Sequence, residues 1–152
     1  MENIPIVILI EDEDEWKNDL EELILQNFPV KVEAYGNFTE GENRIIKGIN
    51  DFALLITDIF PGEAYKDFKG LEFVKIVKKL KQKPVIVVTA ASHLINIVLN
   101  DYDANNAFDK GEFNPSGFIN AVANALDPSN PLYGKAIRNP QMPKGPNKFT
   151  FG

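Results

Sequence analysis

The sequence predicts an α/β fold in which strands and helices alternate around one parallel, doubly wound sheet. Three observations favour it: apolar runs without a helical period recur along the chain, segments with helical periodicity follow them, and the runs end on polar residues. The clearest run, residues 54–57, ends at Asp58, and a Pro61-Gly62 turn follows closely. Open α/β sheets bind ligands at the carboxyl ends of their strands, so we expect the functional residues at that edge.

Composition restricts the class of protein. A chain of 152 residues is long enough for one domain, and 44% hydrophobic and 25% charged residues are ordinary for a globular protein. The net charge of −6 argues against nucleic-acid binding, and the absence of cysteine excludes disulfides and thiolate chemistry. The N-terminus lacks the basic segment of a signal peptide, and no apolar run is long enough to cross a bilayer. We therefore expect a cytoplasmic protein without a nucleic-acid or membrane partner.

The first half of the chain predicts two strand–helix units and a third strand. The strands are expected at residues 4–10, 30–35 and 52–57, and the helices at residues 13–28 and from Thr39 to about Gly48. The second strand alternates polar and apolar residues, which places it at an edge of the sheet. Thr39 and Glu42 have capping-box spacing, and Ile45, Ile46 and Ile49 are expected to form the buried stripe of the second helix.

The second half predicts three more helices and two more strands. A third helix is marked by Leu71, Val74, Val77 and Leu80, and the later elements are expected at residues 85–89, 92–102, 104–109 and 114–126. Lysines gather near the end of the third helix, where they complement its dipole, and they are assigned no other role. They are Lys78, Lys79, Lys81 and Lys83. Asn114 and Pro115 are expected to be the N-cap and the first residue of the last helix.

Five repeats of strand and helix imply right-handed crossovers, with helices on both faces of the sheet. With the second strand at an edge, we expect the flavodoxin-like (βα)5 strand order 2-1-3-4-5. Residues 127–152 hold five of the ten prolines and little periodicity. The sequence therefore predicts a domain at 1–126 and a Pro/Gly-rich tail at 127–152, extended or disordered. Candidate anchors, by which the tail would pack on the domain or a partner, are Leu132, Tyr133, Phe149 and Phe151.

Polar residues end four of the predicted strands. They are Glu11 and Asp12, Asp58, Thr89, and Lys110. Three carboxylates at adjacent strand ends repel one another unless a cation lies between them, and all-oxygen ligation at an open edge suits Mg²⁺. A hydroxyl and an ammonium group beside such a cluster can bind an anion. Carboxylates, a cation, a hydroxyl and an ammonium group together suit phosphoryl transfer in which one carboxylate is the nucleophile.

This pattern resembles the receiver domains of two-component response regulators. That family has an acidic pair after the first strand, a phosphoacceptor aspartate after the third, Thr or Ser after the fourth and lysine after the fifth. The resemblance covers roughly residues 4–126. It implies a phosphorelay protein that takes a phosphoryl group onto Asp58 from a histidine kinase or phosphotransfer protein, and that signals through contact with another protein. Enzymatic activity would be limited to self-phosphorylation and self-dephosphorylation of that aspartate.

The resemblance also implies a role for each site residue. Mg²⁺ would be held by Asp12, Asp58 and the backbone carbonyl of Phe60, with Glu11 bound through water. Thr89 and Lys110 would bind the phosphoryl oxygens.

Three positions depart from the family pattern. Pro61 comes one residue earlier after Asp58 than the family proline does, and Gly111 follows Lys110 where the family commonly has a cis proline. Ala107 stands where the family usually has the switch Tyr or Phe. Phe108 is adjacent, but strand alternation directs it to the other face. The usual coupling between the threonine and an inward-turning aromatic ring therefore cannot operate in its standard form.

Simpler interpretations apply to single residues. Asp58 alone is also a turn residue, Thr89 a strand-end cap, and Lys110 a surface lysine paired with Asp109. The acidic residues 13–15 fit an ordinary helix start, and Trp16 fits core packing. The apolar fourth helix is interpreted equally well as buried or as a partner surface.

Two other classes of function remain open. The first is a degenerate receiver that binds partners without phosphorylation, which Ala107 and Gly111 favour. The second is a phosphatase of the haloacid-dehalogenase type, but that family needs a second aspartate where Phe60 stands. A flavodoxin is disfavoured because no hydroxyl- and glycine-rich phosphate loop follows the first strand.

Overall fold

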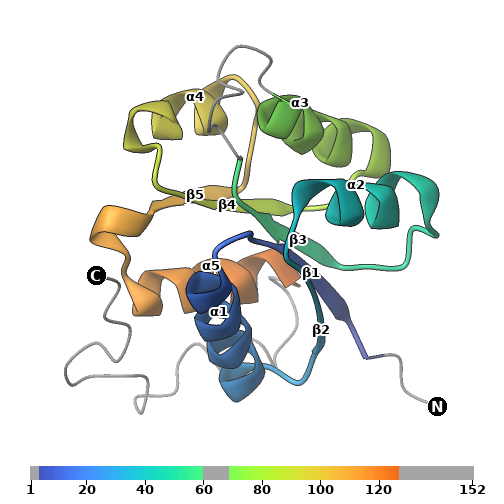
Figure 1. The fold of residues 1–152 in the computed structure, drawn as a ribbon, viewed down its shortest axis with the longest axis horizontal. Helices are drawn as coiled ribbons and strands as arrows, with labels where there is room; N and C mark the ends of the chain where they lie inside the picture. Colours follow the sequence, from blue (N-terminus) through green and yellow to red (C-terminus); the bar gives the residue numbers. More distant parts are fainter. Residues whose placement is uncertain (1–3, 60–68, 127–152) are drawn as a thin grey trace.

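The computed structural model describes residues 4–59 and 69–126. One parallel sheet runs through this part of the chain (Figure 1). Its strands are β1 (Ile6–Ile10), β2 (Lys31–Tyr35), β3 (Leu54–Thr57), β4 (Val85–Thr89) and β5 (Asn106–Asp109). The strand order is β2-β1-β3-β4-β5 and every pairing is parallel. The predicted fold class, strand order and edge position of β2 are therefore confirmed.

Helices cover both faces of the sheet. They are α1 (Asp14–Asn27), α2 (Phe38–Lys47), α3 (Lys69–Ile76), α4 (Ile95–Asn100) and α5 (Pro115–Leu126). In Figure 1, α1 and α5 lie on one side of the sheet, and α2, α3 and α4 on the other. Strand alternation divides the core accordingly, since Val7 and Leu9 pack toward α1 and α5 while Ile8 and Ile10 pack toward the other helices.

Helix starts were predicted with mixed success. Asn114 caps α5 as predicted, because its Oδ1 accepts a hydrogen bond from the Gly117 N–H at 3.1 Å. At α2 the prediction of Thr39 was wrong, since Asn37 is the N-cap and its Oδ1 accepts from the Glu40 N–H at 2.8 Å. The helix begins earlier because Phe38, in its first turn, packs edge-on against Phe73 with ring centroids 5.2 Å apart.

Three residues predicted to be buried face solvent instead. Of the three isoleucines expected to form the buried stripe only Ile45 is buried, whereas Ile46 in α2 and Ile49 after it are exposed. Leu80 is exposed because α3 ends at Ile76 and a π-helical turn, η2 (Val77–Lys81), follows it. The wider turn keeps Val77 on the core but moves Leu80 off the buried face.

The remaining elements differ from prediction mainly at their ends. A 3₁₀ turn, η3 (Ser92–Leu94), precedes the short helix α4, and β5 begins at Asn106 rather than at residue 104. The long loop expected at 62–70, apart from residues 69–70, and the predicted tail at 127–152 lie outside the described residues, so the domain boundary at 126 stays a prediction. Within 4–59 and 69–126 none of the helices has the length and hydropathy of a membrane span.

Candidate functional site

The register of the sheet brings the predicted site residues to one edge. Ile10 of β1 pairs with Thr57 of β3, so the next residues, Glu11 and Asp58, follow neighbouring strand ends. The Asp58 N–H donates to the Ile10 carbonyl oxygen at 3.2 Å, which holds the two ends together. Lys110 begins a 3₁₀ turn, η4 (Lys110–Glu112), directly after β5.

The ammonium group of Lys110 joins the carboxylates of this edge. Its Nζ lies 2.9 Å from Glu11 Oε2, 3.3 Å from Asp58 Oδ2 and 2.9 Å from Glu13 Oε1. Lys110 is buried, and its Nζ lies 5.3 Å from the ring centroid of Trp16. The interpretation of Lys110 as a surface lysine paired with Asp109 is therefore wrong.

Glu11 is the most deeply buried carboxylate of the cluster, with 1% of the residue exposed. Burial, and secondly the charge of Asp58, raise its pKa to about 7, although the ammonium of Lys110 acts in the opposite direction. Burial disfavours the charged form of Lys110, but the charges of Asp58 and Glu11 outweigh it and raise the lysine pKa. For Glu11, the cost of burying its charge therefore exceeds what the attraction to Lys110 returns.

The acidic residues fit a divalent cation. Carboxylate oxygens of Glu11, Asp12 and Asp58 lie within 4.8 Å of one another. Asp12 is exposed to solvent, and the buried Oε1 of Glu11 has no hydrogen-bond partner among the described residues. An oxygen-only donor set with one open side is the kind that Mg²⁺ prefers. The predicted carbonyl ligand, Phe60, lies outside the described residues.

Thr89 is fully buried at the end of β4. Its Oγ1 accepts a hydrogen bond from the Ala91 N–H at 3.1 Å, as a strand-end cap would. Accepting this bond leaves the hydroxyl proton available as a donor. The observed hydrogen bond therefore agrees with the capping interpretation and leaves the predicted phosphoryl contact as a proposal.

Glu13 is the site residue that sequence reasoning missed. It was interpreted as an ordinary acid at a helix start, yet its carboxylate binds Lys110. The Glu13 N–H also donates to Glu11 Oε2 at 3.1 Å. No local signal marks it, because Glu13 is the N-cap of α1 and its partner Lys110 lies 97 residues away in the chain. Trp16 is buried in the core as predicted.

The residue after Asp58 is fixed by close packing. The Ile59 N–H donates to Asp58 Oδ1 at 2.6 Å, and Ile59 is itself buried. Gly70, at the start of α3, packs against Ile59 so closely that an added Cβ would lie 1.9 Å from the Ile59 carbonyl oxygen. Only glycine permits this approach, which holds α3 against the strand end that carries Asp58.

The predicted orientations at positions 107 and 108 are confirmed. Phe108 packs edge-on with Phe113 and Phe118 on the α1 and α5 side, while Ala107 faces the opposite helices. The aromatic ring of β5 is therefore turned away from the face where the family has its switch residue. Among the described residues no peptide bond is cis.

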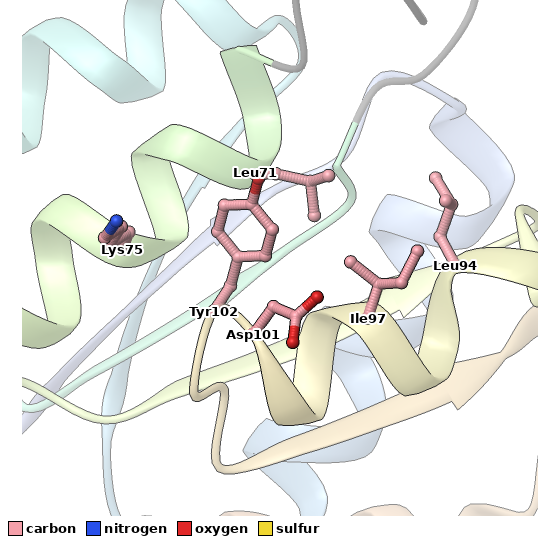
Figure 2. Close-up of a pocket in the computed structure, with 6 residues that line it drawn as sticks. All are labelled: Leu71, Lys75, Leu94, Ile97, Asp101 and Tyr102. Carbon is pink, nitrogen blue, oxygen red and sulfur yellow. The ribbon is translucent and has the colours of Figure 1, made fainter.

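A separate cavity of about 390 Å³ lies between α3 and α4. Leu71, Leu94 and Ile97 form an apolar wall around it, and the ring of Tyr102 lies beside Leu71 (Figure 2). Ile97 is partly exposed here, while Val98 on the next position is buried. One side of α4 is therefore in the core and one side is open, and the interpretation of the open side as a partner surface stays a prediction.

Comparisons with known proteins identify the fold. No family model and no curated protein matches the sequence. A CheY-like response regulator receiver domain protein from Methanospirillum hungatei JF-1 is 21% identical, with a TM-score of 0.66 over 83% of this chain and 96% of that chain. A receiver domain protein from Clostridium thermocellum is 22% identical, with a TM-score of 0.65 over 82% and 96% of the two chains.

A third structure, the signal receiver domain of an HD domain-containing protein from Pseudomonas fluorescens Pf-5, is 16% identical, with a TM-score of 0.66 over 82% and 96% of the two chains. The chain therefore has the fold of response-regulator receiver domains.

Proposed function

We propose that this chain is a phosphoacceptor receiver of a two-component phosphorelay. Asp58 would take a phosphoryl group from a histidine kinase or phosphotransfer protein, and the phosphorylated domain would signal through contact with another protein. The observation that carries the proposal is the buried Lys110, whose ammonium contacts both Asp58 and Glu11 from 52 and 99 residues away in the chain. A buried cation beside an aspartate at a strand end suits the binding of a phosphoryl group.

In the proposed reaction an oxygen of Asp58 attacks the phosphorus of a phosphohistidine. A new P–O bond forms as the P–N bond breaks, and the imidazole nitrogen keeps the electron pair. Lys110 would bind a phosphoryl oxygen, and Thr89 would donate its hydroxyl proton to another. Mg²⁺, held by Asp12 and Asp58 with Glu11 near it, would neutralise charge on the phosphoryl oxygens. The Ile59 N–H would keep Asp58 in position, since it already donates to Oδ1.

Intact mass after incubation with acetyl phosphate and Mg²⁺ tests this proposal. We expect the mass of one added phosphoryl group, dependent on the metal and absent in Asp58→Asn. Asp109→Asn is the matched control, because Asp109 also ends a strand but its Oδ1 accepts from the Gly111 N–H. It should be modified like the native chain. A modification that persists in Asp58→Asn would contradict the assignment of the acceptor.

A degenerate receiver is the second candidate. It is favoured by Ala107 and Gly111, which depart from the receiver pattern. Beryllofluoride with Mg²⁺ distinguishes the two, because Trp16 lies close enough to Lys110 for its fluorescence to report a change. A phosphoacceptor should change in fluorescence and gain thermal stability. No adduct from acetyl phosphate together with no response to beryllofluoride would favour the binding module that works without phosphorylation.

A further inference from the structure

Two aliphatic side chains are exposed at the amino ends of the strands, the end of the sheet that lies away from Asp58. Ile49 lies before β3 and Leu80 before β4, and they are 72% and 77% exposed, the largest values for big hydrophobic residues in the described part of the chain. The side-chain amide of Asn50 donates to the Lys81 carbonyl oxygen at 3.5 Å, so the two segments lie side by side. Side chains exposed to this extent project from the surface rather than line a groove.

Lysines lie close to the two aliphatic residues in the sequence. We call Lys47, Ile49, Lys79, Leu80 and Lys81 the lysine edge. Lys47 and Lys79 are exposed, and Lys81 is half-buried.

The nearby carboxylates do not cancel this charge. Arg44 binds both Glu33 and Asp51, at 2.8 Å and 2.7 Å, so these three groups together carry one negative charge against the three positive charges of the lysine edge. At the opposite end of the molecule, all five residues from 11 to 15 are acidic. The net charge of −6 is therefore distributed unevenly, with a positive region at the end that lies away from Asp58.

The chemistry of the lysine edge selects one kind of partner. Single-stranded nucleic acid bound without sequence preference needs aromatic side chains for base stacking beside a positively charged groove, and the lysine edge has no aromatic residue. An acidic peptide helix needs a groove for its own side chains. An anionic bilayer needs projecting aliphatic groups that enter the interface and lysines that reach the headgroups, as found here.

We propose that the lysine edge docks this domain on an anionic lipid bilayer. Ile49 and Leu80 enter the headgroup region, and Lys47, Lys79 and Lys81 bind lipid charge. This proposal departs from the expectation from sequence of no membrane partner, which treated the lysines only as complements of a helix dipole. Docking is reversible, since each lysine near such a surface contributes about a fivefold gain in binding. It leaves the edge that carries Asp58 turned away from the bilayer.

Sedimentation of the full chain with lipid vesicles tests the proposal. Phosphatidylserine-containing vesicles should bind the chain at low ionic strength, and phosphatidylcholine vesicles should not. Lys79→Glu/Lys81→Glu should lower binding at least about 25-fold, because two attractions become repulsions. Lys17→Glu/Lys75→Glu makes the same charge change outside the lysine edge and should retain most of the binding. Thermal unfolding checks that every variant is folded.

A second pair of variants tests the aliphatic contribution. Ile49→Ser/Leu80→Ser keeps every charge and should weaken binding to the same vesicles severalfold, which a partner held by charge alone would not explain. No binding of the native chain would overturn the proposal. Binding that survives Lys79→Glu/Lys81→Glu would also overturn it, and would assign the contact to another part of the chain. If the chain also binds single-stranded DNA, and Ile49→Ser/Leu80→Ser weakens that binding as much as it weakens vesicle binding, the partner is nucleic acid and not a bilayer.

Discussion

The carboxyl group of Glu11 makes the stability of the metal-free protein depend on pH. Its pKa is about 7 in the folded chain, against an ordinary value of 4.5. Between these values the folded state binds the proton more tightly than the unfolded chain does. The contribution of Glu11 to the free energy of unfolding therefore falls as the pH rises through this window, by about 3 kcal/mol in all.

Glu11→Gln should remove this part of the pH dependence. Urea unfolding in chelator-treated buffer should give a free energy of unfolding that falls less steeply than that of the native chain between pH 4.5 and about pH 7. Glu15→Gln, an exposed carboxylate in the first turn of α1, serves as the control and should keep the native slope. If the free energy of unfolding of Glu11→Gln falls with pH as steeply as that of the native chain, the burial of this carboxyl is not the cause of the pH dependence.

Lys110 stabilises the fold by neutralising buried carboxylates. Lys110→Met should lower the free energy of unfolding by about 3 kcal/mol above pH 7, because it leaves Glu11 and Asp58 without their cation. The loss should be smaller near pH 5, where Glu11 is protonated. Lys17→Met removes a 3.9 Å contact to the exposed Asp14 and should cost less than about 0.5 kcal/mol. Equal losses for Lys110→Met at both pH values would be inconsistent with this account.

At the scale of elements, the start of α2 is held by one side chain. Asn37→Ala should lower the free energy of unfolding by about 1 kcal/mol, because the Glu40 N–H loses its acceptor. Thr39→Ala, at the residue favoured by the capping-box spacing, lies inside the helix and should change stability little. Thermal or urea unfolding of both variants measures the difference. If Thr39→Ala lowers the free energy of unfolding more than Asn37→Ala does, the N-cap is Thr39, as the sequence predicted.

Elements were predictable where local patterns agree with packing. The strands β1, β3 and β4 follow from continuous apolar runs, which can only be buried on both faces. Leu80 was misplaced because its spacing from Val77 assumes a regular helix, and the π turn at Val77–Lys81 has a different period. The start of α2 was misplaced because Asn37 and Glu40 have the same capping spacing as Thr39 and Glu42, and Asn37 is the residue whose side chain caps the helix.

At the scale of the whole molecule, the described residues form two hydrophobic clusters, one on each face of the sheet, from Ile6 to Leu126. We therefore expect the chain truncated after Leu126 to fold, with a far-ultraviolet circular dichroism spectrum of the same helix content per domain and one cooperative thermal transition. The melting temperature compared with the full chain then tests whether residues 127–152 pack on the domain, since packing would make the full chain more stable. Failure of the truncated chain to fold would contradict the domain boundary at 126.

The candidate site was predictable in its members but not in its contacts. Parallel strands bring their carboxyl ends to one edge, so the positions of Glu11, Asp58, Thr89 and Lys110 after four apolar runs were enough to bring them together in the prediction. The contact of Glu13 with Lys110 depends on how the first turn of α1 meets the turn after β5, and no local pattern encodes that meeting.

The sequence by itself determined the alternation of strands and helices, the edge position of β2 and the convergence of charged residues, because periodicity and strand polarity are local properties. Only the tertiary structure decided which groups are buried together. It placed Lys110 among three carboxylates, raised the pKa of Glu11, and brought the segments of the exposed Ile49 and Leu80 side by side. Burial and long-range charge depend on residues distant in the chain, and these exist only once the sheet has formed.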